Sequence, residues 1–306
     1  MSASPRDPRD PDSRAPERVS SLTRALLDAH GTGGFAEPPS LNRPFNLDDA
    51  YRIGAEAARH RLRHGWSFGG WKVGFTNREI WSRWGLDRPI VAPVYRETTF
   101  HATRGAPAQV PLGTRAAPRI EVEVVFGFDA ATGDAAAMSP RTGRAATPPG
   151  RPDRVALGAE LVDCHYEDWR LHPADAVADF GLHAGLVVGP SIPMTGDEGW
   201  RSNPSDALRQ MAVSLSGNGE QLAEGAGKAV LGSPMNVLAE LGGSRSARGG
   251  LDRRMTEYGF PAPPTQAASP RYLVSTGTLT PLVEAHVGTR YEVASDLLPS
   301  FSFDLV

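Results

Sequence analysis

The N-terminal part of the chain carries two helix-like patterns of apolar positions. From Ser20 onward, leucines and alanines recur at a spacing that predicts a short helix, which ends at the glycine run 31–34. Asn46 is predicted to cap a second, longer helix that begins at Leu47 and runs to about Leu62. Acidic side chains occupy the first turn of this helix and arginines its last turns, as the helix dipole favours.

Beyond Gly65 the pattern changes to short β-like runs that glycine and proline interrupt. The predicted strands are Gly70–Phe75, Ile120–Phe128, Ala156–Val162, Gly185–Val188, Ala212–Ser216 and Tyr272–Thr276. Helices are expected at Asp175–Phe180 and at Pro234–Leu241, where a proline stands near the first turn. No compositional break interrupts the strands, so residues 66–306 are predicted to form one β-rich domain.

Three segments have compositions that do not fit this core. Residues 1–18 are mostly Pro, Arg, Asp and Ser, and are predicted to be a disordered tail. Residues 129–153 and 243–270 are rich in Ala, Pro, Gly, Ser and Arg, and are predicted to be long surface loops inserted near those positions. The predicted organisation is therefore a tail, a helical segment at 19–65 that packs on the β-rich part, and the β-rich domain itself.

Composition and charge narrow the classes of function. With 306 residues, 40% of them apolar, the chain can bury a sizeable core. Its 32 basic and 35 acidic residues give a net charge of -3, so neither nucleic acid nor a membrane is the expected partner. The single cysteine, Cys164, excludes an intrachain disulfide and a cysteine-built zinc site. A cytoplasmic protein that acts on small molecules is predicted.

Two glutamates share one face of the predicted strand at 120–128. A period of two places Ile120, Val122 and Val124 on one face, and Glu121 and Glu123 on the other. The second face continues with valine and glycine, so the two carboxylates are expected to point into a partly enclosed space and to need a counter-charge. The alternative is an edge strand that bears a solvated pair of glutamates.

A third carboxylate, Glu160, stands among apolar neighbours in the next predicted strand, and Asp163 follows it. Three convergent carboxylates form a hard oxygen site that suits Mg²⁺, Mn²⁺ or Ca²⁺, whereas zinc prefers nitrogen or sulfur. The alternative is that Glu160 pairs with one of the many arginines, and the sequence spacing does not decide between the two.

Lysine is rare in this chain, because Lys72 and Lys228 are the only lysines among the 32 basic residues. Lys72 lies in a strand-like run with tryptophan, valine and glycine, whose apolar walls are expected to lower the pKa of its amine. A lysine at this place indicates a group that can give up its proton. The alternative is a lysine whose stem lies on the sheet. His183 and Asp179 are further candidates for acid–base or supporting roles.

Four short motifs occur in a recognisable order: Lys-Val-Gly-Phe-Thr at 72–76, Glu-Val-Glu at 121–123, Ala-Glu-Leu-Val-Asp at 159–163 and Val-Ala-Asp at 177–179. In this order the chain resembles the 2-keto-4-pentenoate hydratase and oxalocrotonate decarboxylase family, within the fumarylacetoacetate hydrolase superfamily. Segments 232–239 and 275–280 extend the resemblance, which covers about residues 20–306 apart from the two predicted loops.

The resemblance implies an α+β fold: a fumarylacetoacetase C-terminal-like mixed β-roll or sandwich, with the N-terminal helices packed on it. It further implies a deep pocket with Mg²⁺ or Mn²⁺, and a homodimer or larger homo-oligomer. The residues that match the family pattern are the metal ligands Glu121, Glu123 and Glu160, the pocket lysine Lys72, and Thr276 and Thr278 near the substrate carboxylate. The implied reaction is the hydration or decarboxylation of an enolisable 2-oxo or 2-hydroxydienoate acid through a metal-bound enolate.

The chain departs from the family pattern at several positions, among them Val91 and Ala92, which replace an aromatic-glycine pair. Ile90, expected in the substrate pocket, stands where the hydratases carry an acid, and Asp87 is placed three residues away on the opposite face. His183 stands where a small polar residue is common. One alternative is therefore a decarboxylase, a tautomerase or a biosynthetic enzyme with a bulkier, more apolar substrate. Another is a non-catalytic member that associates with a paralogous subunit.

Overall fold

The computed structural model describes residues 20–42, 44–129, 152–196, 199–242, 255, 257–260 and 271–306. The tail predicted at 1–18 and most of the loops predicted near 129–153 and 243–270 lie outside these residues. The division of the chain at residue 65 stays a prediction.

Nine of the described strands form one large mixed sheet in the order β2-β1-β11-β5-β6-β7-β3, in which β12 pairs with β5 and β8 with β6. The strands of this sheet are β1 (Phe68–Gly74), β2 (Ile90–Tyr95), β3 (Thr99–His101), β5 (Arg119–Asp129), β6 (Arg154–Val162), β7 (His183–Val188), β8 (Ile192–Pro193), β11 (Arg271–Thr278) and β12 (Val283–Glu284). All the predicted strands of this sheet are present, most of them longer than expected.

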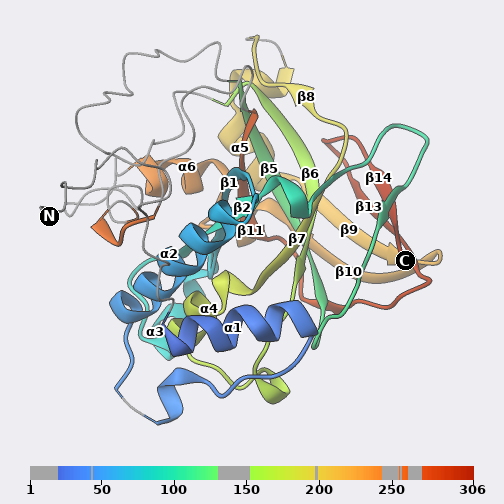
Figure 1. Ribbon diagram of the computed structural model, residues 1–306. Coiled ribbons are helices and arrows are strands. Elements are labelled where there is room, and N and C mark those ends of the chain that lie inside the picture. Colours follow the sequence, from blue (N-terminus) through green and yellow to red (C-terminus); the bar gives the residue numbers. More distant parts are fainter. Residues whose placement is uncertain are drawn as a thin grey trace, which may run out of the picture.

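A second sheet of five strands has the order β10-β9-β13-β14-β4. Its strands are β4 (Ala108–Val110), β9 (Ala212–Gly217), β10 (Glu220–Ala226), β13 (Arg290–Ser295) and β14 (Phe301–Leu305). In Figure 1, β9, β10, β13 and β14 lie on one side of β5 and β6, whereas α1, α2 and α4 lie together at the lower left. Only β9 of this sheet was predicted.

The helices are α1 (Ser21–Thr32), α2 (Leu47–Arg63), α3 (Trp81–Trp84), α4 (Pro173–Ala178), α5 (Pro204–Gln210) and α6 (Met235–Gly242). The predicted cap of α2 is confirmed, because the Asn46 side chain accepts a hydrogen bond from the amide of Asp49. The glycine stop of α1 is confirmed at Gly33, whose left-handed backbone ends the helix. The helix predicted at 175–180 ends earlier, at Ala178, and a short 3₁₀ turn follows at Phe180–Leu182.

Both faces of the central strand β5 are buried. Ile120, Val122 and Val124 belong to the main core, which also contains residues of the second sheet such as Leu215 and Phe303. On the opposite face a small separate cluster consists of Val94, Val125, Ala156, Leu186 and Val188. Glu121 and Glu123 share this opposite face, so an edge strand with solvated carboxylates is excluded.

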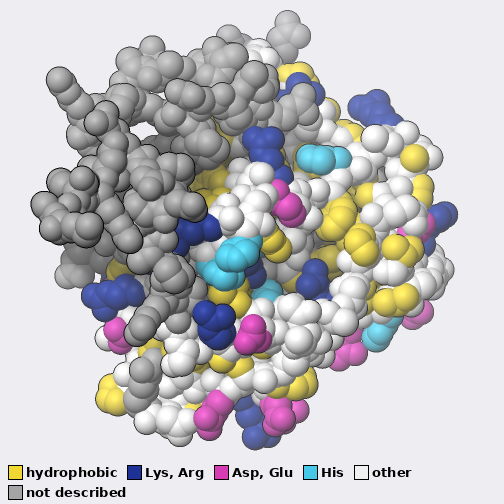
Figure 2. Space-filling view, in the orientation of Figure 1, with side chains coloured by type: hydrophobic (Ala, Val, Ile, Leu, Met, Phe, Trp, Pro, Cys, Tyr) yellow, Lys and Arg dark blue, Asp and Glu magenta, His cyan; other side chains and the backbone are white. Residues whose placement is uncertain are grey.

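The surface is mixed in charge. Figure 2 shows basic, acidic and histidine side chains interspersed on the visible face, without a continuous stripe of one sign. This mixture agrees with the nearly balanced charge of the sequence. A search of the described residues for a helix that combines the length and the apolar character needed to cross a bilayer finds none.

Candidate active site

Four adjacent strands of the large sheet carry the residues of the site. Lys72 on β1 is in register with Ser275 on β11, and Thr278 of β11 is in register with Glu123 on β5. Across the next pair, Glu121 of β5 lies directly opposite Glu160 of β6. Because directly opposed residues point to the same face, strand pairing alone brings the amine and the three carboxylates together.

The amine of Lys72 is enclosed, with 3% of the residue exposed. Its Nζ lies 3.0 Å from Oε2 of Glu160 and donates a hydrogen bond of 2.9 Å to the carbonyl oxygen of Gly181. The alternative of an amine that reaches water is therefore excluded. The other oxygen of Glu160, Oε1, lies 2.7 Å from Nδ1 of His183. Glu160 thus pairs with a lysine and a histidine rather than with an arginine.

Glu121, Glu123 and Glu160 each offer a carboxylate oxygen within 4.8 Å of the other two. Glu123 and Glu160 are fully buried. One oxygen of Glu123 accepts a hydrogen bond from the Ser275 hydroxyl, and the other, Oε1, is buried without a hydrogen-bond partner among the described residues. Three hard oxygen donors, one of them orphaned, fit a divalent cation such as Mg²⁺ or Mn²⁺.

The protonation of the three carboxylates differs. Burial raises the pKa of Glu121 to about 7, with a further rise from the charge of Glu160 and a partial offset from Lys72. Burial also raises the pKa of Glu123 well above its ordinary value, and the neighbouring carboxylates add to this effect. For Glu160 burial acts upward, but the charge of Lys72 and the His183 hydrogen bond outweigh it and lower the pKa. Lys72 therefore stabilises the ionised form of Glu160, whereas burial disfavours the ionised forms of Glu121 and Glu123.

The expectation of a lowered pKa for Lys72 is wrong in this structure. Burial does act to lower the pKa of the amine, but the charges of Glu160, Glu121 and Glu123 outweigh burial and raise it. The amine is therefore protonated at neutral pH.

A cavity of about 380 Å³ extends over this group, a size typical of sites for small molecules. Lys72, Glu121 and Thr278 provide polar lining together with Thr76, Asn77 and Arg119. The apolar lining residues include Phe75, Ile80, Trp84, Ile90, Val162, Trp169, Leu171, Leu182 and Leu282. The cavity thus combines a charged floor with apolar walls.

The structure brings Ile90 and Thr278 to the cavity but not Thr276. A Cβ added to Gly74 would lie 3.2 Å from the Ile90 side chain and 3.6 Å from Nζ of Lys72, so Ile90 packs close to the amine. Thr276 is fully buried outside the lining, and its hydroxyl donates to the carbonyl oxygen of Val124 at 3.0 Å. Asp87 pairs with its neighbour Arg88 and is largely exposed.

His183 supports the carboxylate cluster rather than lining the cavity. Its Nδ1 faces an oxygen that can only accept, so this nitrogen carries the proton that is donated to Glu160. Burial lowers the pKa of His183, and the positive charges of Lys72 and Arg61 add to the effect, although Glu160 opposes it. A neutral His183 that orients Glu160 is the arrangement found behind many metal ligands.

Asp179 lies in a different cluster, away from the cavity lining. Its Oδ1 is 3.0 Å from Nδ1 of His165 and 3.3 Å from Nε2 of His30, and His165 also faces Asp163 at 3.3 Å. Asp163 accepts hydrogen bonds from the amides of residues 116 and 117. Because Arg61 can only donate a hydrogen bond, Nδ1 of His30 accepts it and Nε2 of His30 carries the proton that faces Asp179. These contacts connect α1 with the segments that follow β6 and α4.

This network makes the stability of the protein depend on pH. Hydrogen bonds and charges from the two aspartates outweigh burial and raise the pKa of His165 to about 9, so its contribution is complete below pH 6.5 and is lost as pH rises through 9. Burial lowers the pKa of His30 to about 4, so its contribution is present above pH 6.5 and is lost as pH falls towards 4.

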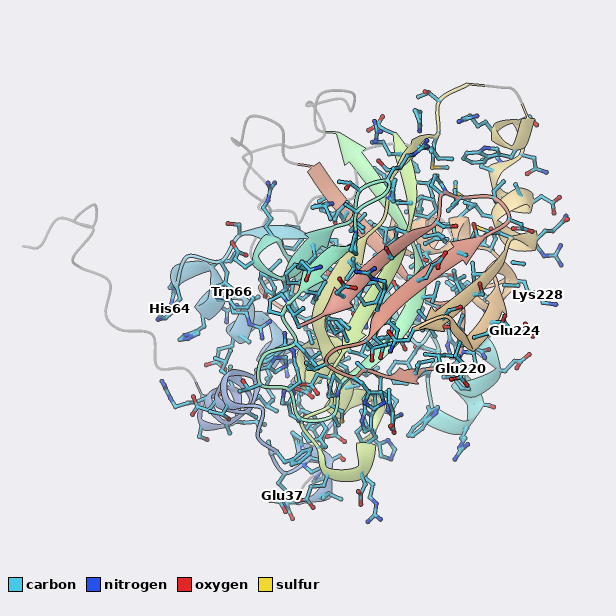
Figure 3. All side chains as sticks on the ribbon, turned by 90° about the vertical axis from the view of Figure 1, so that its right-hand side faces the viewer. Glu37, His64, Trp66, Glu220, Glu224 and Lys228 are labelled. Atoms are coloured by element: carbon cyan, nitrogen blue, oxygen red, sulfur yellow. The ribbon has the colours of Figure 1, made fainter. Side chains whose placement is uncertain are left out.

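We therefore expect the contribution of this network to the free energy of unfolding to be greatest near pH 6.5 and to fall by up to about 3 kcal/mol on either side. Urea unfolding of the wild-type protein and of His165→Asn at constant ionic strength from pH 6 to pH 9 measures the part that His165 contributes. The difference in free energy of unfolding between the two proteins should shrink as pH rises above 6.5, whereas the difference between the wild-type protein and His64→Asn, at an exposed position labelled in Figure 3, should not change with pH. A difference between the wild-type protein and His165→Asn that stays constant with pH would contradict the assignment.

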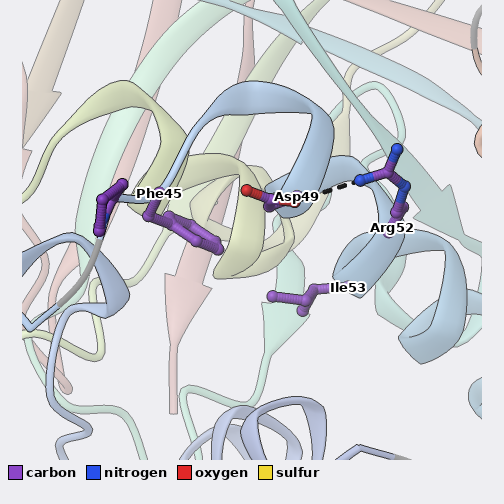
Figure 4. Close-up of a pocket in the computed structure, with 5 residues that line it drawn as sticks. Phe45, Asp49, Arg52 and Ile53 are labelled. Carbon is purple, nitrogen blue, oxygen red and sulfur yellow. Dashed lines mark hydrogen bonds and ion pairs between the residues drawn. The ribbon is translucent and has the colours of Figure 1, made fainter.

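A second hollow, of about 250 Å³, lies beside the first turns of α2. Figure 4 shows Phe45, Asp49, Arg52 and Ile53 around it. Its two charged residues already pair with each other, at 3.1 Å between Nη1 of Arg52 and Oδ1 of Asp49. None of the three clustered glutamates lines it, so the cavity over Lys72 is the better candidate for chemistry.

Comparison with known proteins agrees with this geometry. Over 280 residues the chain is 26% identical to a 2-keto-4-pentenoate hydratase from Paraburkholderia xenovorans. This alignment covers 90% of this chain and 91% of the relative. Over 221 residues it is 23% identical to a 4-oxalocrotonate decarboxylase from a Pseudomonas species, covering 72% and 78% of the two chains. No protein-family profile matches the chain.

Among solved structures, 4-oxalocrotonate decarboxylase from Pseudomonas putida G7, complexed with magnesium and adipate, superposes with a TM-score of 0.69. The two share 21% identity over 93% of this chain and 96% of that one. The expected fold, a mixed β-roll with N-terminal helices, is thereby confirmed. Along about nine tenths of its length the chain is thus similar in sequence to 2-keto-4-pentenoate hydratases, and over a shorter stretch to 4-oxalocrotonate decarboxylase, as the sequence motifs predict.

Proposed function

We propose that this protein is a divalent-metal-dependent lyase that acts on an enolisable 2-oxo acid. The observation that carries the proposal is the convergence of Glu121, Glu123 and Glu160 around one buried amine, Lys72, at the floor of a cavity with apolar walls. The hydratases and the decarboxylase among its relatives support a reaction of this class.

Glu121, Glu123 and Glu160 would hold Mg²⁺ or Mn²⁺, because they offer hard oxygens and because the orphaned oxygen of Glu123 needs a partner. A bound divalent cation would supply Lewis-acid stabilisation of negative charge that develops on a 2-oxo acid. His183 fixes the orientation of Glu160 through its Nδ1 hydrogen bond. The apolar walls exclude water and so strengthen each electrostatic contact at the floor.

Lys72 is the proposed proton-transferring group. Its Nζ lines the cavity, and its contacts with Glu160 and the Gly181 carbonyl hold the ammonium group in place. A positioned acid of this kind contributes about 10²–10⁴-fold to a rate. Because the neighbouring carboxylates keep the amine protonated, Lys72 is placed to donate a proton to a substrate carbon.

Loss of CO₂ is favoured over addition of water by the side chain at position 90. Addition of water needs a proton delivered to one carbon and a proton removed from the attacking water. Decarboxylation needs only the delivery of one proton. The bond to the departing carboxylate breaks, its electron pair passes into the conjugated 2-oxo group, and carbon accepts the proton. Beside Lys72 stands the apolar Ile90, which can neither give nor take a proton. A carboxy-lyase is therefore the first candidate and a hydro-lyase the second.

The experiment is turnover of 2-hydroxydienoate and 2-oxo acids with added Mg²⁺, followed by loss of dienol absorbance and by product mass. A carboxy-lyase product is lighter by CO₂, and a hydro-lyase product is heavier by water. We expect no turnover after chelation and recovery when Mg²⁺ is restored. Turnover that is insensitive to chelation would contradict the proposal. No turnover across the set, together with a co-purifying second chain, would support a non-catalytic partner subunit instead.

A further inference from the structure

The short turn Phe180–Leu182, which connects α4 to β7, has an unusual backbone. Phe180, Gly181 and Leu182 all have positive φ values, of 55°, 69° and 60°. Residues other than glycine rarely adopt this left-handed region, because it brings Cβ close to the following carbonyl oxygen. Strained backbone of this kind persists only where the surrounding structure holds it, and it concentrates at functional sites. The turn is therefore expected to have a function.

The middle peptide of this turn contacts the proposed proton-transferring group. The carbonyl oxygen of Gly181 accepts the 2.9 Å hydrogen bond that Nζ of Lys72 donates. Lysine carries its ammonium group on a flexible four-carbon stem, so fixed acceptors are needed to hold the group in one place. Among the described residues, Glu160 supplies one close acceptor and the turn supplies the other. The backbone of the turn therefore helps to set the position of Nζ.

Close packing ties the Gly181 carbonyl to its place. A Cβ added to Gly181 would lie 2.5 Å from Cβ of Ala92 and 3.3 Å from Cδ of Lys72. The first distance is far below van der Waals contact, so a methyl group at this position would force the turn away from β2, which carries Ala92. Gly181 thus lets the turn approach both β2 and the stem of Lys72.

Buried backbone groups hold both ends of the turn. The carbonyl oxygen of Asp179, just before the turn, accepts a hydrogen bond from the Leu182 amide at 2.8 Å, and the Asp179 carboxylate faces His165. The carbonyl oxygen of Leu182 accepts a hydrogen bond from the amide of Asp163 at 2.9 Å. These contacts supply the surrounding support that a strained backbone needs.

Arg61 holds the first residue of the turn. Its guanidinium carbon lies 4.4 Å from the centroid of the Phe180 ring. The rings of Trp66 and Tyr95 lie at 4.9 Å and 5.2 Å from the same carbon. Arg61 is 7% exposed and Phe180 is 4% exposed, and the attraction between a cation and a ring face is greatest when both are removed from water. The buried cation therefore fixes Phe180, and with it the start of the turn.

We propose that the left-handed turn Phe180–Leu182 is a positioning element for Lys72, whose strained backbone directs the carbonyl oxygen of Gly181 at Nζ and so fixes the ammonium group in the cavity. Gly181 acts through Lys72 and is therefore a positioning residue. A displaced turn would leave the ammonium group with Glu160 alone, and a misplaced proton donor slows the chemical step more than it weakens substrate binding. The catalytic consequence rests on the proposed function, whereas the placement of the ammonium group can be measured without a substrate.

Selective ¹⁵N labelling of lysine measures this placement, because the chain has only two lysines. The Lys72 ammonium group is buried and hydrogen-bonded, so its protons should exchange slowly with water and give an NMR signal at neutral pH. Exposed Lys228 should give none. Gly181→Ala should shift or broaden the Lys72 signal. Addition of Ala92→Gly, which removes the closer contact, should return the signal towards its wild-type position.

Turnover of the best substrate measures the catalytic consequence. Gly181→Ala should lower kcat by about tenfold or more, while KM and the stabilisation by Mg²⁺ stay close to the wild-type values. The double variant Gly181→Ala with Ala92→Gly should recover most of the loss. Ala92→Gly alone is the matched control and should keep the wild-type kcat, because Ala92 is not among the residues that line the cavity.

The proposal is overturned if the Lys72 signal is absent from the wild-type protein or is unchanged in Gly181→Ala. It is also overturned if Gly181→Ala keeps the wild-type kcat, or if its loss of kcat persists in the double variant, which would assign the loss to strain at position 181 itself. A wild-type protein that gives the expected NMR signals but turns over no substrate would refute the proposed function and would support the placement of Lys72 by the turn.

Discussion

Replacement of Lys72 by arginine is expected to lower kcat by about 10²–10⁴-fold while the protein stays folded. Arginine keeps the positive charge that Glu160 needs, but it does not give up its proton at any working pH. Lys72→Met is a poorer test, because it would leave Glu160 buried without its cation at a cost of about 3–5 kcal/mol. The measurements are kcat on the best substrate and the thermal midpoint.

The chain offers a matched control for this substitution. Lys228, the only other lysine, is exposed and lies at the periphery beside β10, as Figure 3 shows. Lys228→Arg should leave kcat unchanged. If Lys72→Arg kept more than about a tenth of the wild-type rate, a factor far below that of a lost acid, Lys72 would not be the proton-transferring group.

Replacement of Glu123 by glutamine is expected to abolish the stabilisation of the protein by Mg²⁺ without weakening the metal-free fold. Glu123 is fully buried beside two further carboxylates, and burial together with these charges disfavours its ionised form. A glutamine oxygen can still accept the hydrogen bond of the Ser275 hydroxyl. The free energy of unfolding of the metal-free variant should therefore equal or exceed that of the wild-type protein.

Glu123→Gln and the wild-type protein should differ in stability when Mg²⁺ is added. At a concentration of 100 times its Kd, a ligand stabilises the folded state by about 2.7 kcal/mol, and the wild-type protein should show this gain. Glu123→Gln should show little of it at the same Mg²⁺ concentration. The control is Glu220→Gln, at an exposed position on β10, which should keep the full gain. Equal stabilisation of Glu123→Gln and the wild-type protein by Mg²⁺ would remove Glu123 from the ligand set.

The carboxylate cluster could be predicted from the sequence because strand geometry is local. The alternation along residues 120–128 places Glu121 and Glu123 on one face before any pairing is known. Glu160 joins them because β6 pairs with β5 in a register that sets Glu160 opposite Glu121.

Contacts between distant segments were not predictable in this way. Asp179 follows α4, and only the packing of α1 brings His30 against it. Thr276 and Thr278 share one strand face by alternation, yet the register of β11 with β5 shifts between Ser275 and Thr278, and only Thr278 lines the cavity. The pKa of Lys72 was misjudged because its neighbours in sequence are apolar, whereas its neighbours in space include three carboxylates.

The most direct test of the account is an anomalous difference map from crystals of this protein grown with Mn²⁺. The account predicts one strong peak near the amine of Lys72, about 2.1 Å from oxygen atoms of Glu121, Glu123 and Glu160. The account is contradicted if the carboxylates keep their metal-free positions around Lys72 with no peak between them. It is also contradicted if the only peak lies at His30, His165 and Asp179.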